Sequence, residues 1–361
     1  QGRYVIPDLP AGRYQVWVRG YGLVDSPRVA GTPGQALNLT AVPAPTPAAA
    51  AEYYPGVYWY SMLRLPAADQ FPGTGDGRGG NGINPALRSQ DQWVDILLQS
   101  CQSCHALGSQ NLRHPRRELG EFPNSHELWI RRIQSGQAMM NMANSMQRFG
   151  VEPAIGMFAD WTDRIARGEQ PATQPRRPEG IERNMVVTLW DWASPTTYLH
   201  DSVATDRRDP TLNANGLIYG SAEESTDEVP VLDPVAHRAW TIRHPVLDPA
   251  TPSQTDSPRG PSPFWGDRAI WDARTSNHNP MMDHRGLVWF TTRLRPAEAQ
   301  PAWCREGGDH PSARIAPLPS SGRQLSFYDP RTQRFDLIDT CFMTHHLYFG
   351  YDSDHTLWTS W

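Results

Sequence analysis

The chain has 361 residues, including 29 Gly and 34 Pro, and its net charge is −5. Charged residues make up 20% and the mean hydropathy is −0.58. This composition excludes a transmembrane bundle and a charge-rich disordered chain, and the Pro and Gly content excludes long coiled coils. The negative charge argues against nucleic acid or an anionic membrane as the main partner, and the sequence has no apolar run long enough to span a membrane. We expect a mainly β chain of two or three domains, with short strands joined by many turns.

Residues 1–42 are predicted to be strands. Tyr14, Val16 and Val18 alternate with outward-facing residues after a Pro-Ala-Gly turn, and Leu37 begins another strand together with Leu39. The run Gly-Arg-Tyr-Val-Ile-Pro-Asp-Leu-Pro-Ala-Gly-Arg-Tyr at 2–14 resembles the last strands of a carboxypeptidase-regulatory-like (transthyretin-like) β-sandwich. The resemblance implies that this segment is the C-terminal part of a structural or carbohydrate-contacting module without a catalytic role.

Residues 43–83 are predicted to be a linker. Its first part, 43–51, alternates Pro with Ala and Thr, which favours an extended chain. The aromatic stretch 53–65 is expected to pack on the following domain, and 71–82 is a Gly-rich loop.

The motif Cys-Gln-Ser-Cys-His at 101–105 predicts covalent haem attachment. In a chain of this composition it arises by chance about once in seven hundred sequences. Two thiols three residues apart can each add to a haem vinyl group, and the next imidazole then lies under the iron. A redox Cys-x-x-Cys or half a zinc site is the alternative, but a zinc site needs a second cysteine pair. We predict one haem c anchored by Cys101 and Cys104, with His105 as the proximal iron ligand.

Helical periodicity surrounds this motif. Trp93, Val94, Leu97 and Leu98 form one apolar face after Ser89 or Asp91 as the helix cap. Further helices are expected after Ser125 and over 159–166. A helix that runs straight into the haem motif resembles a class I cytochrome c domain, which would cover residues 84–170.

The second axial ligand has several candidates. Four methionines lie in one short segment: Met139, Met140, Met142 and Met146. Cytochromes c place an axial thioether in this range, although methionine in helices is usually a core residue. We favour Met142, with Met146 and Met140 as alternatives. A histidine, His114 or His126, and an open site remain. A Met/His pair suits an electron carrier, whereas an open site suits small-molecule chemistry.

Beyond the Pro-rich boundary at 168–180 the apolar period becomes two, with strands predicted at 185–192, 217–221, 229–234 and 239–242. The sequence echoes itself twice, 233–242 in 329–338 and 283–291 in 352–359, which predicts propeller blades. The phrase Asp-His-Arg-Gly-Leu-Val-Trp-Phe-Thr at 283–291 resembles streptogramin (virginiamycin B) lyase-like and NHL-type propellers. Residues 171–361 are therefore expected to form two or three blades of an incomplete β-propeller.

The propeller resemblance implies a site at the hub. Such propellers place metal-binding and catalytic histidines where strands enter the central face, a position that matches His278, His345 and His346. A second metal or a small-molecule substrate would bind there; the alternative is hydrogen-bonded or solvated loop histidines. The segments 198–202 and 205–210 are interpreted as polar turns with surface ion pairs.

Haem c is attached outside the cytoplasm, which predicts a periplasmic or secreted protein. In that oxidising compartment Cys304 and Cys341 would form a disulfide, the alternative being two buried thiols. The chain begins at Gln1 and ends just after a blade strand, so we expect it to be part of a longer protein.

The combined domain order resembles large bacterial chains known as predicted carboxypeptidase-regulatory-like proteins, a resemblance that brings no assigned activity. The predicted function is one-electron transfer to a redox partner protein, coupled to a propeller that binds a substrate or that partner. Two alternatives are a propeller lyase or hydrolase with an ancillary haem, and a structural subunit of a larger redox assembly.

Overall fold

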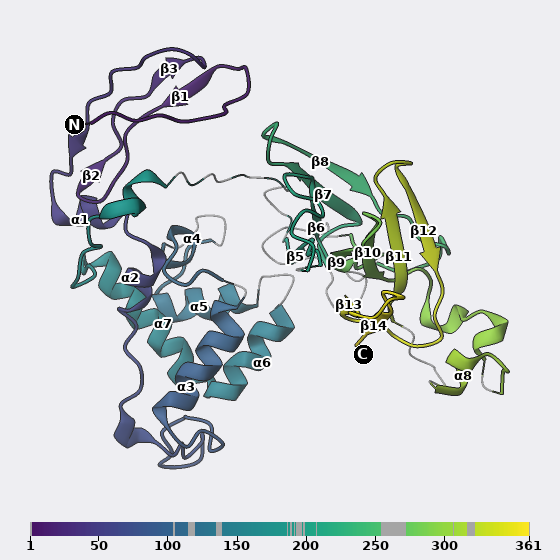
Figure 1. The fold of residues 1–361 in the computed structure, drawn as a ribbon. Coiled ribbons are helices and arrows are strands. Elements are labelled where there is room, and N and C mark those ends of the chain that lie inside the picture. Colours follow the sequence, from purple (N-terminus) through teal and green to yellow (C-terminus); the bar gives the residue numbers. More distant parts are fainter. Residues whose placement is uncertain are drawn as a thin grey trace. The chain divides into compact units, whose positions relative to one another are not determined.

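The computed structural model divides into two compact units, Gln1–Val186 and Val187–Trp361 (Figure 1). It describes residues 2–103, 105–114, 120–134, 139–185, 187, 190, 192, 197, 199–206, 208–253, 272–305, 307–315 and 322–360. The division falls later in the chain than the boundary predicted after residue 170. Within the described ranges, no helix is both long and apolar enough to cross a bilayer.

The N-terminal strands form two small antiparallel pairs, β1 with β3 and β2 with β4. The strands are β1 (Tyr14–Val16), β2 (Leu23–Val24), β3 (Val29–Gly31) and β4 (Val42–Pro43). β1 lies where the alternating pattern predicted it. The strand expected from Leu37 is absent there, because Leu37 packs over Gly31, where an added Cβ would lie 2.7 Å from Leu37 Cδ1. The chain returns to strand geometry only at Val42.

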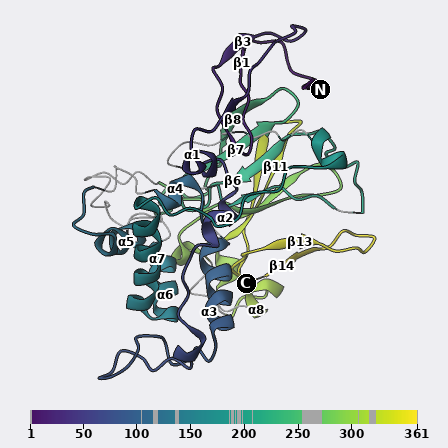
Figure 2. The same ribbon diagram turned by 90° about the vertical axis from the view of Figure 1, so that its left-hand side faces the viewer.

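The rest of the first unit is helical. Its helices are α1 (Pro47–Ala51), α2 (Gly56–Tyr60), α3 (Gln90–Ile96), α4 (Gln110–Arg113), α5 (Ser125–Ile133), α6 (Met139–Phe149) and α7 (Val151–Ala166), with a π-helix at Leu97–Gln102 and 3₁₀ turns at Ala68–Gln70 and Gly180–Asn184. α5, α6 and α7 pack side by side, as both views show (Figures 1 and 2).

Helix boundaries follow their caps. The Ser89 hydroxyl accepts a hydrogen bond from Gln92 N, as predicted for the start of α3. Asn124 caps α5 rather than the predicted Ser125, which is the first helical residue. α7 is much longer than the predicted 159–166. Its start is fixed by Gly150, whose φ of 101° breaks the helix after α6.

The prediction that 43–83 is a linker is wrong. Thr46 Oγ1 accepts a hydrogen bond from Ala49 N and Pro47 occupies the first turn, so the Ala run forms α1 instead of an extended chain. The aromatic stretch packs on the helices as expected: Trp59 is buried in the same core as Trp93. These contacts make 43–83 part of the helical unit.

The second unit contains two four-stranded antiparallel sheets and a hairpin, each built from strands consecutive in the sequence. The first sheet is β5 (Asp201–Ser202), β6 (Ile218–Ser221), β7 (Glu228–Asp233) and β8 (Arg238–Arg243); the second is β9 (His278–Met282), β10 (Val288–Thr292), β11 (Gln324–Asp329) and β12 (Arg334–Ile338); the hairpin is β13 (Leu347–Phe349) and β14 (Leu357–Thr359). 3₁₀ turns at Ala297–Ala299 and Ala302–Cys304 and helix α8 (Pro311–Ile315) lie between β10 and β11. The strands predicted at 217–221, 229–234 and 239–242 are confirmed. Much of the predicted strand 185–192 lies outside the described residues.

The two sequence echoes are repeated hairpins. Asp233 pairs with Arg238 across the β7–β8 turn, and Asp329 pairs with Arg334 across the β11–β12 turn. The second echo covers the β9–β10 and β13–β14 turns. The repeat therefore has one hairpin type between its first and second strands and another between its third and fourth strands. β5, β9 and β13 occupy the first position, and β9 contacts both β5 and β13.

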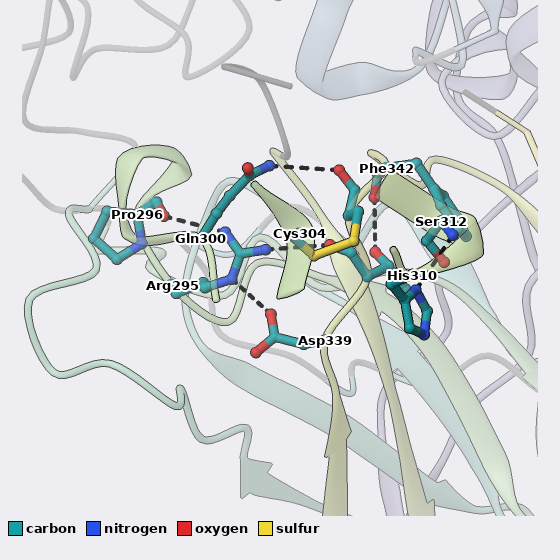
Figure 3. Close-up of a disulfide and its surroundings, with 10 residues drawn as sticks. Arg295, Pro296, Gln300, Cys304, His310, Ser312, Asp339 and Phe342 are labelled. Carbon is teal, nitrogen blue, oxygen red and sulfur yellow. Dashed lines mark hydrogen bonds and ion pairs between the residues drawn. A yellow bond between two sulfur atoms is a disulfide. The ribbon is translucent and has the colours of Figure 1, made fainter. Parts of the chain in front are cut away.

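A disulfide joins Cys304 to Cys341, both fully buried (Figure 3). It ties the 3₁₀ turn after β10 to the segment after β12. The buried Arg295 reinforces this junction, because its guanidinium pairs with Asp339 at 2.6 Å and donates to Thr340 O at 3.1 Å. The predicted pairing is thus present in the structure, rather than two buried thiols.

Candidate functional site

An apolar cavity of about 480 Å³ lies within the helical unit, within the size range of ligand sites. Its walls come from the π-helix, the loop that follows it, and α4 to α7. Four residues that the sequence predicted around a haem line this cavity: Cys101, His105, Met142 and Met146. The fold thus brings together the Cys-x-x-Cys-His motif and the methionine-rich segment.

Cys101 and His105 are held on a tightly wound segment. α3 continues directly into the π-helix Leu97–Gln102, a rare geometry that recurs at functional sites. His105 N donates to Cys101 O at 2.9 Å, and Leu107 N donates to Gln102 Oε1 at 3.1 Å. These bonds fold the chain back after the motif and keep Cys101 and His105 at the same cavity. Cys104 lies outside the described residues.

A positive charge is fixed beside His105. Arg132 lines the cavity, donates to Leu112 O at 3.0 Å and lies 5.1 Å from the Trp129 ring centroid. Part of the His105 side chain reaches solvent, yet the surrounding protein lowers its pKa, and the charge of Arg132 lowers it further. A neutral imidazole is the form that ligates a metal.

The methionines of α6 present two thioethers to the cavity. Met146 is buried and Met142 is half buried, and they lie one helical turn apart. Both are in the cavity wall. The side chain of Met140 lies outside the described residues, so its relation to the cavity is not described.

The histidines considered as alternative axial ligands make ion pairs elsewhere. His114 Nε2 lies 3.5 Å from Glu52 Oε2, and His126 Nε2 lies 2.9 Å from Glu152 Oε2. Among the described residues in the cavity wall, neither of these histidines appears. The geometry therefore favours a methionine over His114 or His126.

The remaining wall is apolar and rigid. Trp129 stacks on Phe158 with ring centroids 4.6 Å apart, and Trp129 Nε1 donates to Thr162 Oγ1 at 2.8 Å. Leu107 and Leu112 are buried around it. Such a wall excludes water, and the cavity can hold a large apolar group with an acidic edge near Arg132.

A second constellation forms in the other unit. One ring nitrogen each of His278, His345 and His346, the three predicted hub residues, lies within 4.8 Å of the others. His278 and His345 stack with centroids 4.8 Å apart. His200 and Asp201 also reach His278 within the same distance. We call these five residues the histidine cluster: His200, Asp201, His278, His345 and His346.

His200 and Asp201 were missed as site residues. They do form the ion pair predicted for 198–202, at 2.9 Å, but they form it against the buried His278. The hydrogen bond with Asp201 raises the pKa of His200, whereas burial lowers the pKa of His278. A signal existed in the sequence: His200 directly precedes β5 as His346 directly precedes β13.

Comparison of the chain with models of known protein families, with curated proteins and with solved structures gives no match. The functional argument therefore depends on the two constellations of side chains.

Proposed function

We propose that the helical unit binds one haem c covalently and transfers electrons one at a time. One observation carries this proposal: a thiol, an imidazole and two thioethers from segments far apart in the sequence line a single apolar cavity. Chance placement of these four groups around one apolar space is improbable, whereas a covalent haem requires this set of donors.

The residues fit the group. Cys101 would anchor the ring together with Cys104, and His105 would ligate the iron from the same segment. The apolar wall with Trp129 and Phe158 suits the face of the macrocycle. Arg132 offers a fixed positive charge for a carboxylate of the bound group.

Met142 is our proposed second axial ligand, with Met146 as the alternative. Both thioethers are at the cavity, and the more exposed Met142 needs less rearrangement to reach a ligand there. The bound iron would supply a one-electron couple. The chain would raise its potential in two ways: through thioether ligation and through an apolar wall that disfavours the more highly charged oxidised state.

The second unit would provide the binding surface for the substrate or redox partner whose electrons the haem collects. We propose that its two four-stranded sheets and its hairpin are successive blades of a β-propeller. Support comes from the identical strand order of the two sheets and from the hairpins that repeat at equivalent positions. The disulfide supports a periplasmic or secreted location, since structural disulfides persist in oxidising compartments.

The experiment is a redox titration with visible spectra of the full chain, expressed with a haem-attachment system. We expect a reversible one-electron transition and the long-wavelength band of a thioether-ligated ferric haem. Met142→Ala should abolish that band and lower the potential. Met157→Ala, a buried methionine of α7 that is not in the cavity wall, should leave both unchanged.

Loss of the band only in Met146→Ala would assign the ligand to Met146. A band that survives both Met142→Ala and Met146→Ala would contradict thioether ligation from α6. A chain that shows no reversible transition would contradict the proposed function.

A further inference from the structure

The histidine cluster stands at the same place in three repeats. His200 directly precedes β5, His278 is the first residue of β9, and His346 directly precedes β13. These strands are linked to one another: Ala204 N, just after β5, donates to Pro280 O, and Leu347 N donates to Asn279 Oδ1 at 2.8 Å. The fold thus gathers imidazoles from three separate repeats at one point, which local hydrogen bonding within a loop does not explain.

His278 is the centre of the cluster, with a side chain that is 1% exposed. Its Nδ1 lies 3.0 Å from His345 O. A carbonyl only accepts hydrogen bonds, so Nδ1 carries the proton and Nε2 of the neutral ring presents a lone pair. That lone pair lies 3.2 Å from Asp201 Oδ2 and 4.0 Å from Glu223 Oε1. Three acceptors face one another here, an arrangement that a bound cation satisfies.

The outer hydrogen bonds resemble those that orient metal ligands. A ligating histidine typically donates its other ring nitrogen to a carbonyl or carboxylate. His278 does so to His345 O, and His200 Nδ1 does so to Asp201 Oδ2 at 2.9 Å. Each ring thereby directs its remaining nitrogen, Nε2, toward the carboxylates.

Charge around the cluster is arranged in the same sense. Arg323 donates to Glu223 Oε1 at 2.6 Å and to Ser276 Oγ at 2.8 Å, which fixes the carboxylate in place. Its other oxygen, Oε2, faces His200 Nε2 at 3.5 Å. Two carboxylates against one guanidinium leave a net negative charge beside neutral imidazoles, which attracts a cation.

The backbone beside the cluster is held in an unfavourable conformation. Glu223, Ser276 and Asn279 have φ values of 39°, 43° and 52°, in the left-handed region that non-glycine residues rarely adopt. Asn279 uses this geometry to donate its N–H to Asp201 Oδ2 at 3.1 Å. Such strain concentrates where a site must be pre-organised.

We propose that the histidine cluster binds one divalent first-row transition-metal ion. Imidazole nitrogens with a single carboxylate favour ions such as Zn²⁺, Cu²⁺, Ni²⁺ or Fe²⁺ over Mg²⁺ and Ca²⁺, which prefer oxygen ligands. His278, His345 and His346 form the nitrogen face, His200 and Asp201 complete the set, and Glu223 with Arg323 orients it. This site is independent of the haem cavity in the other unit.

The test uses the full chain without a purification tag, stripped of loosely bound metal with a chelator. Co²⁺ is titrated as the probe by calorimetry and visible spectroscopy, because its spectrum reports nitrogen coordination. We expect one Co²⁺ per chain, displaced by Zn²⁺ and unaffected by excess Mg²⁺. His346→Ala should weaken binding by about 100-fold; this side chain is exposed, so its removal leaves the fold intact.

His278→Ala should abolish binding, and near-ultraviolet circular dichroism monitors its fold. His284→Ala is the matched control, since this histidine of the β9–β10 turn stacks on His355 outside the cluster. Absence of stoichiometric Co²⁺ binding to the unaltered chain would overturn the proposal. Binding to His346→Ala with unaltered affinity and spectrum would overturn it as well.

Discussion

His244 allows a quantitative prediction about pH and stability. It directly follows β8 and its side chain is 1% exposed. Its Nδ1 donates to Pro245 O at 2.8 Å, and its Nε2 accepts from Ser326 Oγ at 2.7 Å. The rings of Phe290 and Phe335 lie against it, with centroids 5.9 and 4.5 Å away. The neutral ring is therefore fully satisfied, whereas a protonated ring would bury a charge.

Burial lowers the pKa of His244 to about 4, against the ordinary 6.5 that the unfolded chain retains. Between these values the unfolded chain binds a proton that the folded chain does not, so stability falls as pH falls. This contribution is fully present above pH 6.5 and is lost progressively down to about pH 4. At about 1.4 kcal/mol per unit, the decline from His244 alone is about 3 kcal/mol.

The perturbation is His244→Phe combined with Ser326→Ala, which removes the titrating ring and the hydroxyl that would lose its partner. Urea unfolding of the full chain is measured from pH 7 to pH 4, with hydrogen exchange in β8 and β11 reporting the second unit. The double variant should lose about 3 kcal/mol less than the unaltered chain over this range. His310→Phe, at an exposed position, should keep the full decline. Equal declines in the double variant and the unaltered chain would refute the reasoning.

Two further predictions concern stability within each unit. Replacing Cys304 and Cys341 together by Ser should lower the free energy of unfolding by about 4 kcal/mol, because the disulfide closes a loop of 37 residues; urea unfolding measures this, and an unaltered chain insensitive to reductant would contradict it. Arg164→Ala should cost about 2 kcal/mol in thermal unfolding, because this buried guanidinium donates to Met62 O at 2.5 Å and so holds the segment 43–83 on α7. The exposed Arg167→Ala should change little, and equal losses in the two variants would show that the segment is not anchored this way.

Patterns with a short physical cause were predictable. The Ser89 cap, the β1 alternation and the strands β6 to β8 follow from local hydrogen bonding and from the two-residue period. The hairpin echoes were predictable for the same reason, since each turn is encoded by its own Asp. The segment 43–83 was not, because Pro and Ala suit both an extended linker and a short helix. The contact that decides, burial of Trp59 against α7, is tertiary.

The two constellations divide in the same way. The haem motif is local, so Cys101 and His105 were predicted together, and a methionine partner followed from density along one helix. The histidine cluster depends on how three repeats meet. His278, His345 and His346 were predicted through a resemblance, while Asp201 appeared as one more surface ion pair, because nothing in a two-residue β5 marks it as the first strand of a sheet.

The most direct test of the account is whether haem stays on the chain after denaturation. The full chain is produced in a bacterial periplasm with a haem-attachment system, unfolded, and extracted with acidified organic solvent. We predict that one haem per chain remains on the protein, and that the Cys101→Ser, Cys104→Ser double variant retains none. A colourless chain, complete extraction of haem from the unaltered chain, or equal retention by the double variant would contradict the central claim.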